Sequence, residues 1–221
     1  LMHGVIDSPD IPLNVSRSYL QSNTYVKKLS AHIVKKVCDK INSMFNTDRD
    51  ALEKIYDDIM PFIEYACMRD QKFYDRVKNS LLYKTVDGDW VTLTEYLTTA
   101  DIAEEKKDGK DEVKKVFYAS DVTRQAVYVN MFKAADKKII ILDKLMDNQF
   151  ISMLENTEKN VKFFRIDANT DAIKDTDGEA KTSEDLEKLF KEISGNDKLT
   201  VSLVALKDKK IPAILNISED S

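Results

Sequence analysis

The sequence has few glycines and no glycine-rich loop. Five glycines occur in 221 residues, and neither the GxxxxGK nor the GxGxxG pattern is present. Such loops are the usual means of wrapping backbone N–H groups around nucleotide phosphates. The sequence therefore does not encode a complete nucleotide pocket of either kind.

Motifs for metal binding and redox chemistry are also missing. Cys38 and Cys67 have no CxxC spacing, and His3 and His32 form no cluster with other ligand residues. Both cysteines fall inside helical patterns. We therefore predict buried free thiols and no metal site.

Long apolar runs are absent as well. No stretch approaches the roughly 18 residues that a membrane-spanning helix needs, and the N-terminus lacks the features of a signal peptide. The net charge of −5 is opposite to the basic excess of a nucleic-acid binder. With 43% hydrophobic and 33% charged residues, we expect a globular, cytoplasmic protein that binds neither membrane nor nucleic acid.

One segment near the N-terminus has the features of an anion site. Asn14 suits a turning backbone, Ser16 is a good helix N-cap, and Arg17 would then lie in the first helical turn. A cation at that position opposes the helix dipole, whereas beside free backbone N–H groups it would suit a phosphate. The alternative is that Arg17 pairs with a nearby acid, Asp7 or Asp10.

A helical layer is predicted next. Apolar residues recur at helical spacing in three successive stretches, and Pro61 should kink or interrupt the second of them. The stretches are Val26, Leu29, Ile33, Val37 and Ile41; then Leu52, Ile55, Ile59, Phe62, Ile63 and Ala66; then Phe73, Val77 and Leu81.

The polar face of the first predicted helix is basic, with Lys27, Lys28, Lys35, Lys36 and Lys40. These lysines either add to an anion field near Arg17 or form an ordinary solvated helix face.

From Tyr83 the pattern changes to α/β. An Asp87-Gly88 turn predicts a hairpin, and Thr92 with Glu95 fits a capping box. Strands at 116–118, 139–142 and 161–166 alternate with helices at 123–134 and 148–154, which indicates a parallel sheet covered by helices. The charged stretch 104–115 is expected to be an exposed loop.

Polar residues follow the three strands, at Ser120, Asp143 and Asp167. Ligands of parallel sheets bind at such strand ends. These residue types are also ordinary helix caps and loop residues, which is the interpretation that we favour.

The last part of the chain is predicted to hold a polar linker, a helix that Gly195 ends, and two strands at 199–206 and 211–217. A helix and a hairpin of this size cannot bury a full core.

The segment Gly4–Arg17, GVIDSPDIPLNVSR, resembles a segment near the middle of the ninety-kilodalton heat-shock protein chaperones, in their bacterial high-temperature protein G branch. The resemblance extends over the chain and implies an α/β fragment of five parts. These are the end of a larger α/β layer with a catalytic loop (1–24), a helical connector (25–83), a small Rossmann-like α/β/α layer (84–170), a linker (171–182) and a truncated start of the dimerisation domain (183–221).

The resemblance also implies roles for individual residues. Arg17 matches the arginine that reaches the γ-phosphate of ATP on a separate N-terminal domain, and Gln21 belongs to the same catalytic loop. Asn14 has a loop-shaping or polar-contact role. ATP with magnesium is the cofactor implied for the full-length protein, and the fragment alone is expected to be inactive as an ATPase.

A client-binding role is implied for the helix after the second strand of the small layer, with Asn148, Gln149, Phe150 and Ser152. Relatives often have an aromatic residue in place of Gln149, and packing of Phe150 and Met153 against the sheet is the alternative. The implied partners are the N-terminal nucleotide-binding domain, unfolded client proteins and, in the full-length protein, a second copy. A stand-alone interaction scaffold is the rival function.

Overall fold

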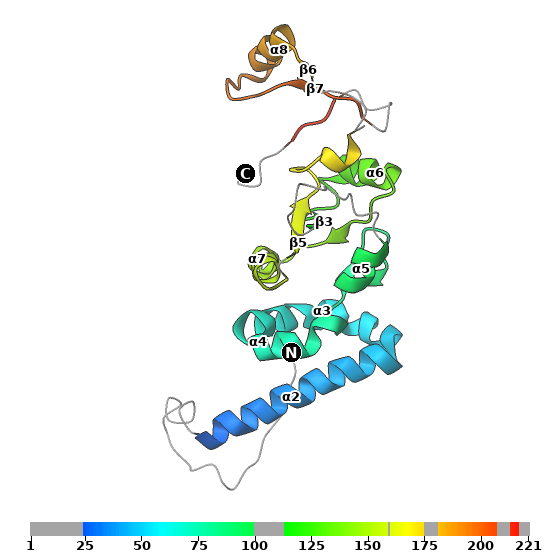
Figure 1. Ribbon diagram of the computed structural model, residues 1–221, viewed down its shortest axis with the longest axis vertical. Helices are drawn as coiled ribbons and strands as arrows, with labels where there is room; N and C mark the ends of the chain where they lie inside the picture. Colours follow the sequence, from blue (N-terminus) through cyan, green and yellow to red (C-terminus); the bar gives the residue numbers. More distant parts are fainter. Residues whose placement is uncertain (1–23, 100–112, 159, 175–180, 207–212, 217–221) are drawn as a thin grey trace. The chain divides into compact units, whose positions relative to one another are not determined.

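A computed structural model describes residues 24–99, 113–158, 160–174, 181–206 and 213–216. The described chain divides into two compact units, one ending at Leu81 and one beginning at Leu82. Figure 1 shows both units, with the chain coloured along the sequence from blue to red. The Arg17 segment lies outside the described residues. The five domain boundaries remain a prediction.

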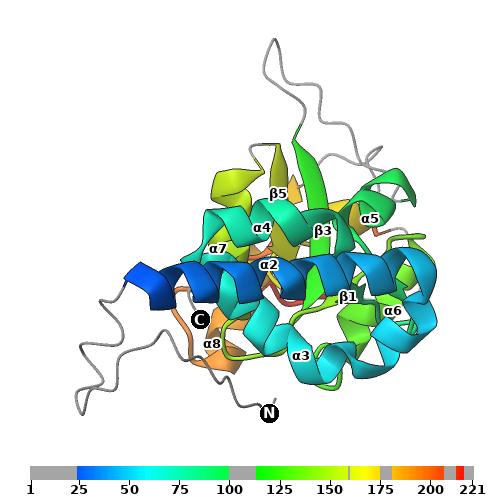
Figure 2. The same cartoon turned by 90° about the horizontal axis from the view of Figure 1, so that it is seen from below.

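The first unit is a layer of helices, as predicted (Figures 1 and 2). It contains α2 (Thr24–Thr47), α3 (Arg49–Arg69), α4 (Gln71–Val77) and the short 3-10 helix η1 (Lys78–Ser80). Two aspartates start the later helices: the Asp48 carboxylate accepts from the Ala51 amide at 3.3 Å, and the Asp70 carboxylate from the Lys72 amide at 2.9 Å. These caps satisfy amides that have no partner inside their helices.

Side chains from all three helices form the core of this unit. Cys38 and Ile41 of α2, Tyr56 of α3, and Phe73 and Tyr74 of α4 are buried. Both cysteines are buried free thiols, as predicted.

Helix α3 continues through Pro61, so the predicted interruption is wrong, whereas the predicted kink stays a prediction. Proline removes the hydrogen bond to the carbonyl four residues earlier, here that of Asp57. Asp57 lies on the exposed side of α3, and burial of the opposite face maintains the helix on both sides of the proline.

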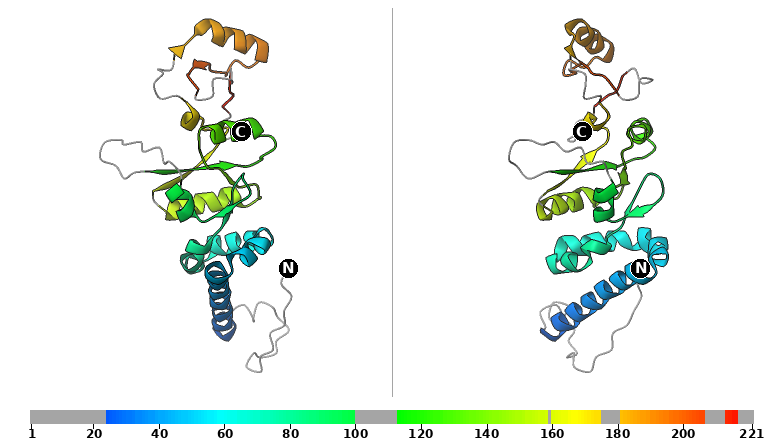
Figure 3. Two further views of the ribbon diagram at one scale, coloured as in Figure 1. Left: turned by 90° about the vertical axis from the view of Figure 1, so that its right-hand side faces the viewer. Right: turned by 45° about the vertical axis from the view of Figure 1, so that its right-hand side comes forward.

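The second unit contains the predicted three-layer α/β/α arrangement. Strands β3 (Lys114–Ala119), β4 (Ile140–Ile141) and β5 (Val161–Arg165) form a parallel sheet in the order β4-β3-β5. Helix α6 (Ala126–Ala134) covers one face, and α5 (Leu93–Thr99) and α7 (Asp147–Thr157) lie on the other (Figure 3). Strand β3 begins at Lys114, inside the predicted loop, because it pairs with β5 from Val161 onward.

The entry into this unit follows the predicted turn chemistry. Strands β1 (Tyr83–Lys84) and β2 (Trp90–Val91) pair in an antiparallel hairpin, in which Gly88 adopts a φ of 95°. The Lys84 ammonium lies 5.4 Å from the centre of the Trp90 ring. In the capping box, the Thr92 amide donates to the Glu95 carboxylate at 2.8 Å and the Glu95 amide to the Thr92 hydroxyl at 3.1 Å.

The core of the second unit lies between β3 and α6. Phe117 and Phe132 meet edge to face, with ring centres 5.0 Å apart. On the other face, the buried Tyr96 hydroxyl accepts from the Phe117 amide at 2.9 Å and donates to the Lys138 carbonyl at 2.8 Å. This phenol therefore ties α5 to the central strand, and burial raises its pKa.

The C-terminal elements depart most from the predictions. Helix α8 (Glu184–Ser194) ends at Gly195 as expected, with a φ of 65° at that glycine. Strand β7 is only Ser202–Leu203, and its partner is β6 (Lys181–Thr182), inside the predicted linker. The predicted linker, 171–182, also contains the 3-10 turn η2 (Asp171–Ile173), whose Ile173 is 2% exposed.

The expected strand at 211–217 is not formed in its described part, residues 213–216. Side chains of the small layer bind this stretch instead. The Tyr128 hydroxyl donates to the Leu215 carbonyl, and the Thr170 hydroxyl donates to the Asn216 side chain at 2.9 Å. Contacts with Tyr128 of α6 and with Thr170, just before η2, therefore replace a second strand.

Candidate functional site

The predicted catalytic residues Asn14, Arg17 and Gln21 lie outside the described residues. Helix α2 begins at Thr24, three positions after Gln21. The described surface that lies nearest to them along the sequence is therefore the first half of α2.

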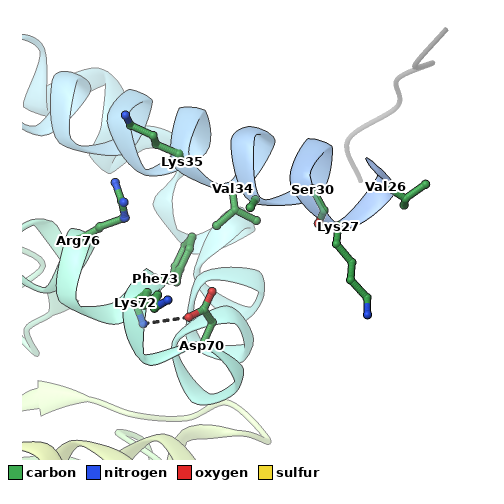
Figure 4. A pocket seen from close by; sticks show the side chains of 10 residues that line it. Val26, Lys27, Ser30, Val34, Lys35, Asp70, Lys72, Phe73 and Arg76 are labelled. Carbon is green, nitrogen blue, oxygen red and sulfur yellow. Dashed lines mark hydrogen bonds between the residues drawn. The ribbon is translucent and has the colours of Figure 1, made fainter. Parts of the chain in front are cut away.

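A groove of about 500 Å³ lies between this half of α2 and α4. Figure 4 shows Val34 and Phe73 on its apolar floor, with Lys35 and Arg76 at one side. The full lining is Val26, Lys27, Ser30, Ala31, Val34, Lys35, Asp70, Lys72, Phe73 and Arg76.

The groove has an excess of positive charge, because Lys27, Lys35, Lys72 and Arg76 face a single acid, Asp70. The Asp70 carboxylate already accepts from the Lys72 amide. Lys27 and Lys35 come from the predicted basic face, whereas Lys28, Lys36 and Lys40 are exposed elsewhere on α2. Two of the five lysines of the predicted basic face thus line the groove, and the other three form an ordinary solvated surface.

The predicted client-binding residues lie on α7. Asn148, Gln149 and Ser152 are exposed, and the Ser152 hydroxyl donates to the Asn148 carbonyl at 2.9 Å. Phe150 is only 2% exposed, so the packing alternative describes it in this structure. Its ring is not on the surface that a client would contact.

Sequence reasoning missed Leu145, which is 98% exposed in the turn before α7. Nearby, the buried Asp147 carboxylate accepts from the Lys144 amide at 2.8 Å. The bond fixes the turn on which Leu145 lies. The sequence feature that could have indicated its exposure is a leucine directly after Asp143-Lys144, outside any apolar periodicity.

The strand-end residues have structural partners. The Ser120 amide donates to the buried Gln125 side chain at 2.9 Å, Asp143 pairs with Lys144 at 3.0 Å, and Asp167 pairs with the Arg165 guanidinium at 2.6 Å. These contacts support the interpretation as caps and loop residues.

The described residues contain no group of three or more His, Cys, Asp or Glu side chains placed to hold a metal ion. Over the same residues, no helix is long and apolar enough to cross a membrane.

Comparisons with known proteins agree with one another. The family model for Hsp90 protein matches residues 1–214. The chain is 41% identical over 172 residues to the chaperone protein HtpG of Porphyromonas gingivalis, and 38% identical over 169 residues to that of Bacteroides fragilis. These matches cover 77% and 76% of this chain but 24% of each relative, so the chain spans about a quarter of their length.

Among solved structures, the middle domain of a heat shock protein from Plasmodium falciparum is similar, with a TM-score of 0.48 and 14% identity over 66% of this chain and 60% of that one. The family match over nearly the whole chain and the close HtpG relatives identify this protein. It belongs to the Hsp90 family of chaperones, in the bacterial HtpG branch.

Proposed function

We propose that this chain is part of an ATP-dependent chaperone and that Arg17 reaches the γ-phosphate of ATP bound on another domain. The observation that supports this proposal is the segment Gly4–Arg17, which lies inside the family match. Gln21 would support the closed arrangement of the same loop, and Asn14 would shape it. ATP is a substrate here, with its magnesium ion held mainly by the other domain.

The chemistry that we assign to Arg17 is electrostatic. A guanidinium placed against the terminal phosphate stabilises the charge that shifts there in the transition state, and it favours domain closure. The described residues offer no acidic cluster for magnesium, and the sequence has no glycine-rich phosphate loop. Turnover would therefore need the nucleotide-binding domain.

The test is to mix this chain with a separately prepared nucleotide-binding domain of an HtpG protein and to measure ATP hydrolysis. We expect stimulation that falls at least about 100-fold in Arg17→Ala, as for other arginines that act on phosphoryl transfer. Arg124→Ala is the matched control, because the Arg124 side chain is 88% exposed and its guanidinium lies 3.4 Å from the Asp121 carboxylate.

Two outcomes would contradict this assignment. Hydrolysis by the chain alone that disappears in Arg17→Ala would place a complete site here. Stimulation that survives Arg17→Ala would favour an interaction scaffold, in which Arg17 pairs with an acid.

We also propose that unfolded proteins bind beside the N-terminus of α7. The supporting observation is Leu145, whose side chain is 98% exposed. Asn148, Gln149 and Ser152 are exposed on the helix that follows. An apolar side chain presented among polar ones suits extended client segments of mixed composition.

Leu145→Ser should weaken this binding about ten-fold, since burying one leucine contributes ~1.5 kcal/mol. Binding of a fluorescently labelled unfolded protein would be titrated by anisotropy. Val127→Ser is the control, because Val127 is also exposed, at 60%, but belongs to α6. Equal effects of the two substitutions would refute a specific role for Leu145.

A further inference from the structure

One stripe of α3 faces solvent at the spacing of a coiled-coil seam. Six of its residues are separated by four and three positions in turn. They are Ala51, Ile55, Asp58, Phe62, Tyr65 and Arg69, and we name them the α3 stripe. Phe62 is 60% exposed, Tyr65 50% and Ile55 40%.

This exposure is not required by the fold of the helical unit. The opposite side of α3 already supplies the core, with Leu52, Tyr56, Ile63 and Cys67 buried. An isolated exposed apolar residue is normal, whereas an aliphatic and two aromatic residues along a heptad seam are typical of a helix that packs against a second helix.

The charges on the stripe suggest which helix that is. Asp58 precedes the aromatic pair and Arg69 follows it. In heptad terms Phe62 and Arg69 occupy a positions, and Asp58 and Tyr65 occupy d positions. Antiparallel helices place a positions of one opposite d positions of the other.

A second copy of this chain supplies a matching helix without any assumption about the sequence of another protein. If Phe62 lies opposite Tyr65 of a second antiparallel α3, Asp58 lies opposite Arg69 of that copy, and symmetry repeats both contacts. An alignment shifted by one heptad would instead place the Asp58 carboxylate against an aromatic ring, which leaves a charge poorly solvated and unpaired. The placement of the two charges thus favours the first alignment over the shifted one.

Arg69 is already oriented for this contact. Its guanidinium donates to the Tyr65 hydroxyl at 3.0 Å and lies 5.6 Å from the centre of that ring. The cation is therefore held along the stripe, where less side-chain entropy is lost when a carboxylate arrives.

We propose that α3 is a self-association surface, through which two copies of this chain pair in antiparallel orientation. In this alignment Ile55 lies beyond the end of the partner's α3, and the two aromatic side chains on each copy, Phe62 and Tyr65, bury less than the about 800 Å² per partner of stable complexes. We therefore expect weak association, with a dissociation constant on the order of 0.1–1 mM.

The test is analytical ultracentrifugation of the whole 221-residue chain over a concentration series at low salt. We expect a monomer–dimer equilibrium that weakens in salt. Asp58→Arg and Arg69→Asp should each lower the association constant at least about five-fold, since each places like charges opposite each other twice. An equimolar mixture of the two variants should restore association, because every facing pair then has opposite charges again.

Phe62→Ser should abolish association, and far-UV circular dichroism would check that each variant is folded. Asp57→Arg is the matched control, with the same charge change on the same helix but off the stripe. A monomer at all concentrations would overturn the proposal. So would a dimer that is insensitive to the stripe variants, or a mixture of folded variants that fails to associate.

Discussion

Among single residues, Cys67 is a thiol that its surroundings keep protonated. Burial raises its pKa from 9.0 to about 12, and the nearby Glu64 and Cys38 act in the same direction. Burial also raises the pKa of Cys38. Thiolates are the reactive form of cysteine, so we expect both side chains to resist alkylation and oxidation in the folded protein.

This shift predicts a dependence of stability on pH. The folded protein holds the Cys67 proton more tightly than the unfolded chain does, so the contribution is complete below pH 9 and is lost as the pH rises toward about 12. Between about pH 8.5 and about pH 10.5, the free energy of unfolding should fall by up to ~2 kcal/mol from this group.

Guanidinium unfolding of the wild type and of Cys67→Ala, followed by circular dichroism, would measure this contribution. The cavity left by the substitution gives an offset that does not depend on pH, and the raised pKa of Tyr96 affects both proteins alike. The difference between the two proteins should therefore narrow as the pH rises. A constant difference would show that Cys67 does not titrate in this range.

At the scale of elements, Pro61 lies inside α3 at a cost that the rest of the helix offsets. Proline in a helix interior is about 3 kcal/mol less favourable than alanine, although part of that cost is relieved where the helix adapts. Pro61→Ala should therefore raise the free energy of unfolding by roughly 1–2 kcal/mol.

Urea unfolding of the Pro61→Ala variant would measure this change. Ile55→Ala, also on α3 but in an exposed position, is a control that leaves the backbone pattern unaltered. A loss of stability in Pro61→Ala would mean that packing of the proline ring outweighs the missing hydrogen bond.

The elements that sequence reasoning predicted best are those whose signal is local. The helical periodicity from Val26 to Ile41, the Asp87-Gly88 turn and the Thr92 capping box all formed. The strand at Lys181–Thr182 was missed, because its residues are polar and only their distant partner, Ser202–Leu203, makes them a strand. Pairing over such distances leaves no local pattern in sequence.

The candidate site shows the same division. Arg17 was selected from a local contradiction, a cation where the helix dipole disfavours one, and from the resemblance that the family match supports. The exposure of Leu145 and the burial of Phe150 could not be predicted in the same way. They depend on how α7 and the turn before it pack against β5, which a helix of mixed composition does not specify by itself.

At the scale of the whole molecule, the chain consists of two compact units within about a quarter of the length of its HtpG relatives. The proposed roles are distributed between them. The groove and the α3 stripe belong to the first unit, and Leu145 belongs to the second. Arg69 of the α3 stripe directly precedes Asp70 of the groove, so we expect substitutions at these two places to be coupled.

The hairpin that opens the second unit determines what tryptophan fluorescence reports about unfolding. Trp90 is the one tryptophan of the sequence, and it lies on β2, within the second unit. Indole fluorescence will therefore report when the hairpin and its sheet come apart, and it will remain silent about the three helices that precede them. A melting curve recorded from tryptophan emission describes the second of the two units.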